Sequence, residues 1–230
     1  MQAAAIIVAA GSGTRLGSPL PKAFVCVAGR TMLSYSLRTI AAVPAVMELI
    51  VMVPAGMETV ARAEVTSADP QLPVILAAGG IERQDSVRIA LGLTSSEADL
   101  VIVHDAARPF APLVLFQRCI DRAAQDGAAI AAIPLADTLK RVDERGRIGA
   151  TVPRAGLWQA QTPQVFARKL IVAAHDYALG RGIKATDDAD LVEQMGQTVE
   201  VVEGSPMNLK ITAPDDLALA EALAARLFPH

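Results

Sequence analysis

The chain has 230 residues, of which 52% are hydrophobic and 20% are charged; this balance is typical of a folded domain and excludes a largely disordered chain. The net charge of -3 and the aromatic content of 3% exclude the basic, base-stacking surface that nucleic acid polymers require. Apolar stretches stay below the roughly 18 residues of a membrane span, so no membrane partner is expected.

The first predicted element is a strand of small apolar residues at positions 3–8, and a glycine-rich segment follows it directly. That segment reads Ala-Ala-Gly-Ser-Gly-Thr-Arg-Leu-Gly over residues 9–17 and is closed by Pro21 and Lys22. Glycines let a backbone approach a ligand and point N–H groups at an anion, and Arg15 and Lys22 add positive charge. This glycine loop is therefore predicted to bind a phosphate chain, with contacts from Ala10, Gly11, Ser12, Gly13 and Thr14.

The spacing of the glycines differs from that of the two commoner phosphate-binding loops. The order G-x-x-x-x-G-K-[ST] of a P-loop is absent, and Gly11, Gly13 and Gly17 carry one residue too many for G-x-G-x-x-G. A dinucleotide-dependent oxidoreductase is excluded on this spacing.

Four further apolar runs alternate with segments of helical periodicity. The runs are residues 49–53, 74–77, 100–103 and 128–133, and the helical segments are 32–40, 57–65, 85–91 and 113–124. Such alternation predicts βαβ units and an α/β fold with a doubly wound, mostly parallel, Rossmann-like sheet.

His104 and Asp105 directly follow the apolar run at residues 100–103. The glycine loop and Asp105 would both lie at the carboxyl edge of the sheet, where open α/β folds bind ligands. A carboxylate at a strand end commonly holds Mg²⁺ against substrate phosphates; the alternative for Asp105 is a helix cap or a loop acid. His104 is interpreted as a structural histidine.

The alternation stops at residues 135–153, which are rich in charge and glycine. Residues 143–146, between two short extended segments at 138–142 and 148–152, predict a hairpin turn. A hairpin with so little apolar surface does not support itself, so this protruding β-arm is expected to pack on another surface.

Three helices at residues 169–179, 188–195 and 214–227 and a strand at 198–202 complete the predicted order. One domain over residues 1–230, rather than two small ones, is expected.

Cys26 and Cys119 match neither a metal-binding spacing nor a disulfide framework. The N-terminus has no charged region typical of a signal peptide. A reducing cytoplasm is the expected location.

Five motifs occur in an order that resembles one family. After the glycine loop come Gly-Gly-Ile-Glu-Arg-Gln-Asp-Ser-Val (79–87), Val-His-Asp-Ala-Ala-Arg-Pro (103–109), Asp-Thr-Leu-Lys (137–140) and Asn-Leu-Lys-Ile-Thr (208–212). From about residue 3 to about residue 222 the chain resembles 2-C-methyl-D-erythritol 4-phosphate cytidylyltransferase, a family of the methylerythritol phosphate isoprenoid pathway. The resemblance implies a transferase that joins CTP and this polyol phosphate, with Mg²⁺ as cofactor.

The resemblance also implies roles for residues near the nucleotide. Arg15, Lys22 and Lys210 would act on the triphosphate and the transition state, and Asp105 would contact the metal. Gly79, Gly80 and Ser86 would read the cytosine base, with Arg83 as a candidate anchor of that segment. Some relatives carry a second acid shortly before the lysine, but residues 205–209 of this chain contain none.

For the acceptor, the resemblance assigns Thr138 and Arg154 of the arm, contributed across a homodimer. Arg108 and Thr186 are further acceptor candidates, and Thr186 is equally interpretable as a helix N-cap. Taken without the resemblance, each of these residues also fits an ordinary surface role.

Two other functions remain open on the sequence. The first is a related cytidylyltransferase that uses ribitol 5-phosphate as acceptor, which only the base-reading segment and the arm would distinguish. The second is a catalytically silent module that binds CTP. Four charged residues in distant motifs argue against the silent module, because binding alone requires neither these cations nor a metal ligand.

Overall fold

A computed structural model describes residues 1–228 of the chain. Its centre is a seven-stranded sheet in the order β11-β7-β10-β6-β1-β4-β5. Six of these strands are β1 (Ala3–Val8), β4 (Val46–Val53), β5 (Val74–Ala78), β6 (Leu100–Asp105), β7 (Ala128–Pro134) and β11 (Glu200–Glu203). The seventh, β10 (Trp158–Ala167), runs antiparallel to both of its neighbours, and the other pairs are parallel. The predicted doubly wound, mostly parallel α/β fold is confirmed.

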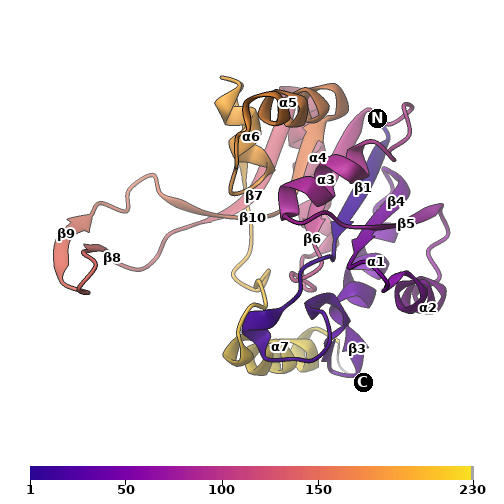
Figure 1. The fold of residues 1–230 in the computed structure, drawn as a ribbon, viewed down its shortest axis with the longest axis horizontal. Helices are drawn as coiled ribbons and strands as arrows, with labels where there is room; N and C mark the ends of the chain where they lie inside the picture. The colour runs from indigo at the N-terminus through magenta and orange to yellow at the C-terminus, as the bar shows by residue number, and fades with distance from the viewer. Residues whose placement is uncertain (229–230) are drawn as a thin grey trace.

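Helices cover both faces of this sheet (Figure 1). Buried residues alternate along β1: Ala3, Ala5 and Ile7 join the core beneath one set of helices, and Ala4 and Ile6 join the core beneath the other. The first set is α1 (Met32–Ala41), α2 (Glu58–Ala68) and α4 (Leu113–Asp126); the second is α3 (Arg83–Leu91), α5 (Arg168–Arg181) and α6 (Asp188–Gln194). Apolar residues buried on both faces explain why the strands read as uninterrupted apolar runs.

A third, smaller core joins the two ends of the chain. Helix α7 (Pro214–Leu227) buries Ala220 and Ala224 against Leu16 of the glycine loop and against Tyr35. Two short 3₁₀ turns, Thr14–Leu16 and Lys22–Phe24, and the small pair β2 (Cys26–Val27) and β3 (Arg30–Thr31) lie in this region. The C-terminal helix therefore supports the loop that the sequence assigns to phosphates.

The predicted elements are present, and each of their ends lies within three residues of the predicted position. The strand predicted at residues 198–202 lies instead at Glu200–Glu203. Strand β10 was not predicted, because it contains Pro163 and four polar residues, a composition that argues against a central strand. The structure accommodates the proline because the pairing of β10 with β7 is interrupted between Ala160 and Gln164.

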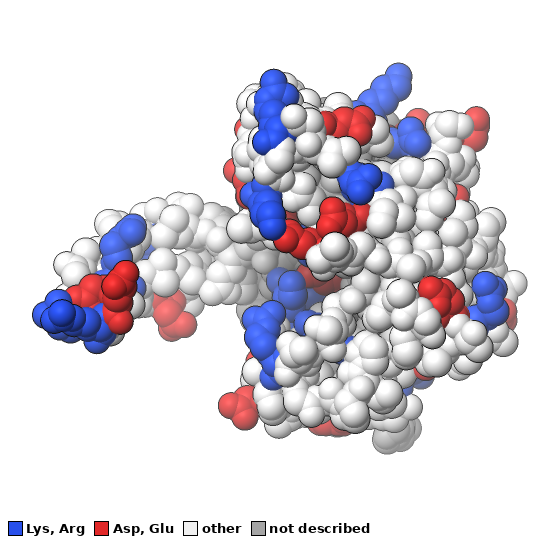
Figure 2. All heavy atoms as spheres, viewed as in Figure 1, with Lys and Arg blue, Asp and Glu red and all other residues white. Residues whose placement is uncertain are grey.

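The β-arm projects away from the body of the molecule (Figure 1). It is the two-stranded antiparallel pair β8 (Leu139–Val142) and β9 (Ile148–Val152), as the sequence predicted. Residues 141–151 are all exposed, and Val142 and Ile148 expose 55% and 65% of their surfaces. Charged side chains gather at the tip of the arm (Figure 2). The arm thus offers apolar surface that its own chain leaves uncovered.

Candidate active site

A cavity of about 410 Å³ opens at the carboxyl edge of the sheet. Four parts of the chain line it: residues 8–23 around the glycine loop, residues 80–86 after β5, residues 105–107 after β6, and Lys210 near the C-terminus. In Figure 2 the body is hollowed beside the root of the arm, and Lys and Arg side chains lie in the hollow. Ligands of open α/β folds bind at this edge.

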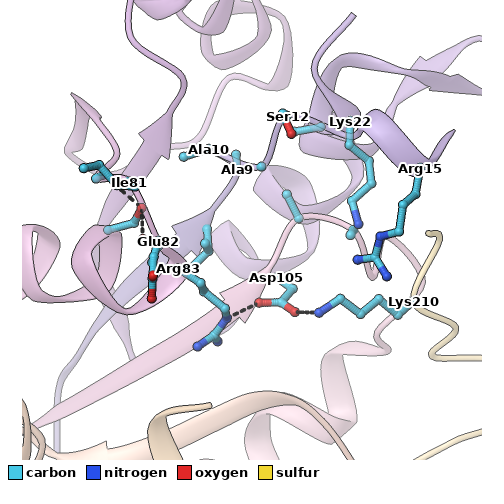
Figure 3. Close-up of a pocket in the computed structure, with 17 residues that line it drawn as sticks. Ala9, Ala10, Ser12, Arg15, Lys22, Ile81, Glu82, Arg83, Asp105 and Lys210 are labelled. Carbon is cyan, nitrogen blue, oxygen red and sulfur yellow. Dashed lines mark hydrogen bonds and ion pairs between the residues drawn. The ribbon is translucent and has the colours of Figure 1, made fainter. Parts of the chain in front are cut away.

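Lys22 lies directly against the backbone of the glycine loop at Gly13. Gly13 has a φ of 72°, and a Cβ added there would lie 2.8 Å from Cβ of Lys22 and 2.9 Å from its backbone nitrogen. Gly13 is therefore required both by its left-handed conformation and by this close approach. The side chains of Lys22 and Arg15 extend from the loop toward Asp105 and Lys210 (Figure 3).

Lys22 has an unusual protonation equilibrium. Burial, followed by the repulsion of Lys210, lowers the pKa of the Lys22 ammonium to about 8, although Asp105 opposes the shift. The cavity lining carries four cationic side chains, Arg15, Lys22, Arg83 and Lys210, against two carboxylates, Glu82 and Asp105. A polyanion such as a nucleoside triphosphate would supply the missing charge.

Asp105, the last residue of β6, lies between two cations. Its Oδ1 accepts a hydrogen bond from Nε of Arg83 at 2.9 Å, and its Oδ2 accepts one from Nζ of Lys210 at 2.6 Å. Burial alone would raise the pKa of this carboxyl, but the charges and hydrogen bonds of Arg83 and Lys210 outweigh it and hold the pKa well below its usual range. Asp105 is therefore ionised at any physiological pH.

The neighbouring His104 is buried and neutral. Burial lowers its pKa to about 4, with Asp105 opposing the shift. Its Nε2 lies 3.2 Å from the carbonyl oxygen of Arg108, so the ring proton is assigned to Nε2. Its Nδ1 then accepts from Oγ1 of Thr162 at 2.9 Å, and the same hydroxyl accepts from the backbone N–H of Asp105 at 3.1 Å. The geometry agrees with the structural role that we expected for His104.

Arg83 extends the charge network into the core. Its Nη1 donates to Oδ2 of Asp188 at 2.6 Å, and Oδ1 of Asp188 lies 3.1 Å from Nε2 of His175. Burial alone would lower the pKa of the Arg83 guanidinium, but the two carboxylates raise it. Arg83 is the first residue of α3, so it ties the segment after β5 to the end of β6.

The predicted base-reading segment is packed tightly against the glycine loop. A Cβ at Gly79 would lie 2.3 Å from Cβ of Ala10, and one at Gly80 would lie 2.3 Å from Cβ of Asp85. The hydroxyl of Ser86 accepts from the N–H of Gly80 at 3.1 Å and donates to the carbonyl of Glu82 at 3.2 Å. Ser86 therefore holds the shape of this segment.

The four predicted acceptor residues do not line the cavity described in residues 1–228. Thr138 and Arg154 are exposed on the arm, where Arg154 donates to the carbonyl of Ala136. Arg108 donates to the carbonyls of Asn208 at 2.7 Å and Ala160 at 3.1 Å. Thr186 is exposed, and the N-cap of α6 is Asp187, not Thr186.

Sequence reasoning missed several residues that shape the site. They are Asp188 and His175 behind Arg83, and Gln161, Thr162 and Asn208 behind Asp105 and Lys210. Only Asn208 carried a signal, because it belongs to the same short motif as Lys210. Residues 208–212, which form this motif, lie outside the strands and helices.

Comparison with known proteins identifies the family. The family model of 2-C-methyl-D-erythritol 4-phosphate cytidylyltransferase matches residues 3–226. The chain belongs to this family. The family predicted from the five motifs is confirmed, and with it the enzyme class of a cytidylyltransferase.

Relatives and solved structures of the cytidylyltransferase family agree. The chain is 46% identical to the family's protein from Deinococcus radiodurans, over 97% of this chain and 90% of that protein. It is 43% identical to the one from Syntrophus aciditrophicus, over 95% of this chain and 94% of that protein. The crystal structure of the family's protein from Thermus thermophilus superposes with a TM-score of 0.81 at 40% identity, covering 97% of this chain and 99% of that one.

Proposed function

We propose that this chain transfers the cytidylyl group of CTP to 2-C-methyl-D-erythritol 4-phosphate, giving 4-diphosphocytidyl-2-C-methyl-D-erythritol and pyrophosphate. The observation that carries the proposal is the convergence of Arg15, Lys22 and Lys210 with Asp105 on one cavity, in a member of this family. These residues come from three distant parts of the sequence, and phosphoryl-type transfer depends mainly on positioning anions and neutralising charge.

In the proposed reaction an oxygen of the acceptor phosphate attacks the α-phosphorus of CTP in line. The bond from that phosphorus to the bridging oxygen breaks, and pyrophosphate leaves with the electron pair. Arg15, Lys22 and Lys210 neutralise the charge that grows on the phosphate oxygens. A phosphate monoester is already ionised at neutral pH, so a general base is unnecessary. His104 is buried and neutral, and we do not assign it the role of a base.

Specificity for cytosine is assigned to the segment around Gly79 and Gly80. Cytosine presents a ring carbonyl, a ring nitrogen and an exocyclic amine, which backbone groups can distinguish from uracil without aromatic stacking. Ser86 already binds Gly80 and Glu82, so its main contribution is to hold those backbone groups in place.

The residues present fit a magnesium cofactor held largely by the substrate. Over residues 1–228 there is no group of three or more His, Cys, Asp or Glu side chains that could hold a metal ion, whereas Asp105 is ionised and lines the cavity. Mg²⁺ is commonly bound by one or two carboxylates together with substrate phosphates. Asp105 would be the protein ligand, and the bound ion would neutralise phosphate charge.

We further propose a homodimer in which the β-arm completes the neighbouring site. The exposed apolar surface of Val142 and Ile148 supports an arm that packs on a second copy of the chain. Thr138 and Arg154, which lie on the arm, would then reach the acceptor bound in the partner's site.

A cytoplasmic location is proposed as well, since Cys26 and Cys119 are both free thiols. No helix within the described part of the chain has the length and apolar character to cross a membrane.

A substrate panel tests this function. CTP, UTP, ATP and GTP are each combined with 2-C-methyl-D-erythritol 4-phosphate, ribitol 5-phosphate and other polyol or sugar phosphates, and pyrophosphate release is measured. The proposal expects turnover with CTP and the methylerythritol phosphate. Preference for ribitol 5-phosphate would assign the alternative acceptor, and CTP binding without turnover of any acceptor would indicate the silent module.

A further inference from the structure

The segment that carries Lys210 is held by two buried carboxamides. Nε2 of Gln161 donates to the carbonyl of Ser205 at 2.9 Å, and Oε1 of Gln161 accepts from Nδ2 of Asn208 at 3.2 Å. Nδ2 of Asn208 also donates to the carbonyl of Thr162 at 2.8 Å. Gln161 is 5% exposed and Asn208 is fully buried. This carboxamide pair therefore joins β10 to the turn before Lys210.

Asp105 is held by the same short stretch of β10. The hydroxyl of Thr162, the residue after Gln161, accepts from the backbone N–H of Asp105 at 3.1 Å. Gln161 and Thr162 lie where the pairing between β10 and β7 is interrupted, between Ala160 and Gln164. The carbonyl of Thr162 is therefore available to accept the bond from Nδ2 of Asn208, outside the sheet. One two-residue stretch thus supports both members of the Asp105–Lys210 pair.

The position of Lys210 depends on this support because its side chain is 42% exposed and packing does not confine it. The backbone around it belongs to no strand or helix. Its other fixed points include the bond from the N–H of Ile211 to the carbonyl of Ala107, the bond from Arg108 to the carbonyl of Asn208, and the bond from the N–H of Thr212 to Oδ2 of Asp216. A shift of about 1 Å in such a group is enough to reduce a reaction rate substantially.

We propose that Gln161 and Asn208 are positioning residues of the transfer reaction, which fix the backbone from which Lys210 reaches Asp105 and the substrate phosphates. The inference rests on the proposed function, because it assumes that Lys210 acts on those phosphates. Gln161 and Asn208 do not line the described cavity, so their effect is transmitted through Lys210.

A double-mutant cycle between Gln161 and Lys210 tests the proposal. Gln161→Met removes both polar atoms at similar volume, and we expect kcat to fall about tenfold while KM for CTP changes less than about twofold. In a Lys210→Met background the same change should lower kcat by less than about twofold, because the group that it positions is gone. Equal losses in both backgrounds would overturn the proposal in favour of a purely structural role.

Gln164→Met is the matched control. Gln164 lies on the same strand, is also buried, and bonds to Asp187 and Ala189 at the start of α6 rather than to the Lys210 segment. Any loss that it causes should be the same with and without Lys210. Coupling of Gln164 to Lys210 as strong as that of Gln161 would contradict a specific role for the carboxamide pair.

Gly204→Ala disturbs Gln161 without altering its chemistry, and keeps the proposal testable if Gln161→Met fails to fold. A Cβ at Gly204 would lie 2.3 Å from Oε1 of Gln161, the movable end of a flexible side chain. We expect a lower kcat that again depends on Lys210. An unchanged kcat would count against the proposal.

A measurement that needs no turnover separates this inference from the proposed function. Trace acetylation of the free enzyme, read by peptide mass spectrometry, reports the reactivity of Lys210 relative to the exposed Lys169. Both Gln161→Met and Gly204→Ala should raise the relative reactivity of Lys210 about threefold or more by releasing it from Asp105. Unchanged reactivity would overturn the positioning role, whatever reaction the enzyme catalyses.

Discussion

The ammonium group of Lys210 lies 2.6 Å from Oδ2 of Asp105, although the two residues are 105 positions apart in the chain. Asp105 ends a buried central strand, and Lys210 lies on an irregular segment before the last helix. Folding thus places the ionised carboxylate of Asp105 between the cations of Arg83 and Lys210 at the edge of the cavity. When substrate binds, Lys210 can leave this carboxylate and bind the phosphates instead. This pair is the centre of the proposed site.

Asp105→Asn should lower the rate of pyrophosphate release by about 100-fold or more, because it removes the proposed metal ligand and leaves Lys210 without its partner. The measurement is a titration with MgCl₂ at saturating CTP and acceptor. Asp126→Asn, which alters a surface carboxylate paired with Arg122, is the control and should behave like the parent. A near-normal maximal rate for Asp105→Asn at high Mg²⁺ would refute the assignment.

The pH dependence of kcat/KM for CTP should report Lys22. Its pKa is lowered to about 8, chiefly by burial and then by Lys210, so the free enzyme carries the charged ammonium below that pH and loses it above. We expect kcat/KM to decline as the pH rises through 8. Lys22→Arg keeps its charge and should flatten the alkaline side of the profile; parallel declines in the two proteins would assign the titration to another group.

Lys22→Ala should reduce kcat by about 100-fold at saturating CTP, since a charge that neutralises the transition state is lost. Lys169→Ala on α5 is a suitable control, because Lys169 is exposed and does not line the described cavity. Turnover of Lys22→Ala close to that of the parent protein would show that Lys22 has no part in the reaction.

His104 should make the protein less stable as the pH falls from about 6.5 toward 4. Its pKa is about 4 in the folded state, chiefly because of burial, and near 6.5 when unfolded, so the unfolded chain binds more protons in this range. The expected loss of unfolding free energy between pH 7 and pH 5 is about 2 kcal/mol.

Urea unfolding at pH 7 and pH 5 measures this loss, and His104→Gln should remove most of it. The depressed pKa values of Asp105 and Asp188 affect stability only below about pH 4, where unfolded carboxylates take up protons, so they do not disturb this window. An equal loss in the His104→Gln variant would show that His104 is not the group responsible.

Mixing two inactive variants tests whether the arm completes a neighbouring site. Lys22→Ala damages the cavity and Arg154→Ala damages the arm. If Arg154 acts across a dimer, a mixed dimer contains one site with both residues intact, and unfolding and refolding the two variants together should restore about a quarter of the parent activity. Activity that stays at the level of the single variants would place Arg154 in its own chain's site or outside the reaction.

The sequence alone predicted the strands of the parallel sheet, the glycine loop, the arm and the family. Each of these depends on residues that are close together in the chain: Ala3–Val8 is recognisable as a buried strand because consecutive residues are apolar, and Gly13 is recognisable because a tight phosphate loop needs its conformation. Arg15, Lys22, Asp105 and Lys210 were identifiable from the motifs that contain them.

Only the tertiary structure decided which distant groups meet. Strand β10 was missed because Pro163 and the polar residues around it are untypical of a central strand, and Gln161 and Thr162 bond to the segment around Asn208 outside the sheet. No local pattern indicates that Arg83 binds both Asp105 and Asp188, or that Arg108 binds the carbonyl of Asn208. Such bonds join residues between 22 and 105 positions apart, and they form because burial requires each polar group to find a partner after the chain has folded.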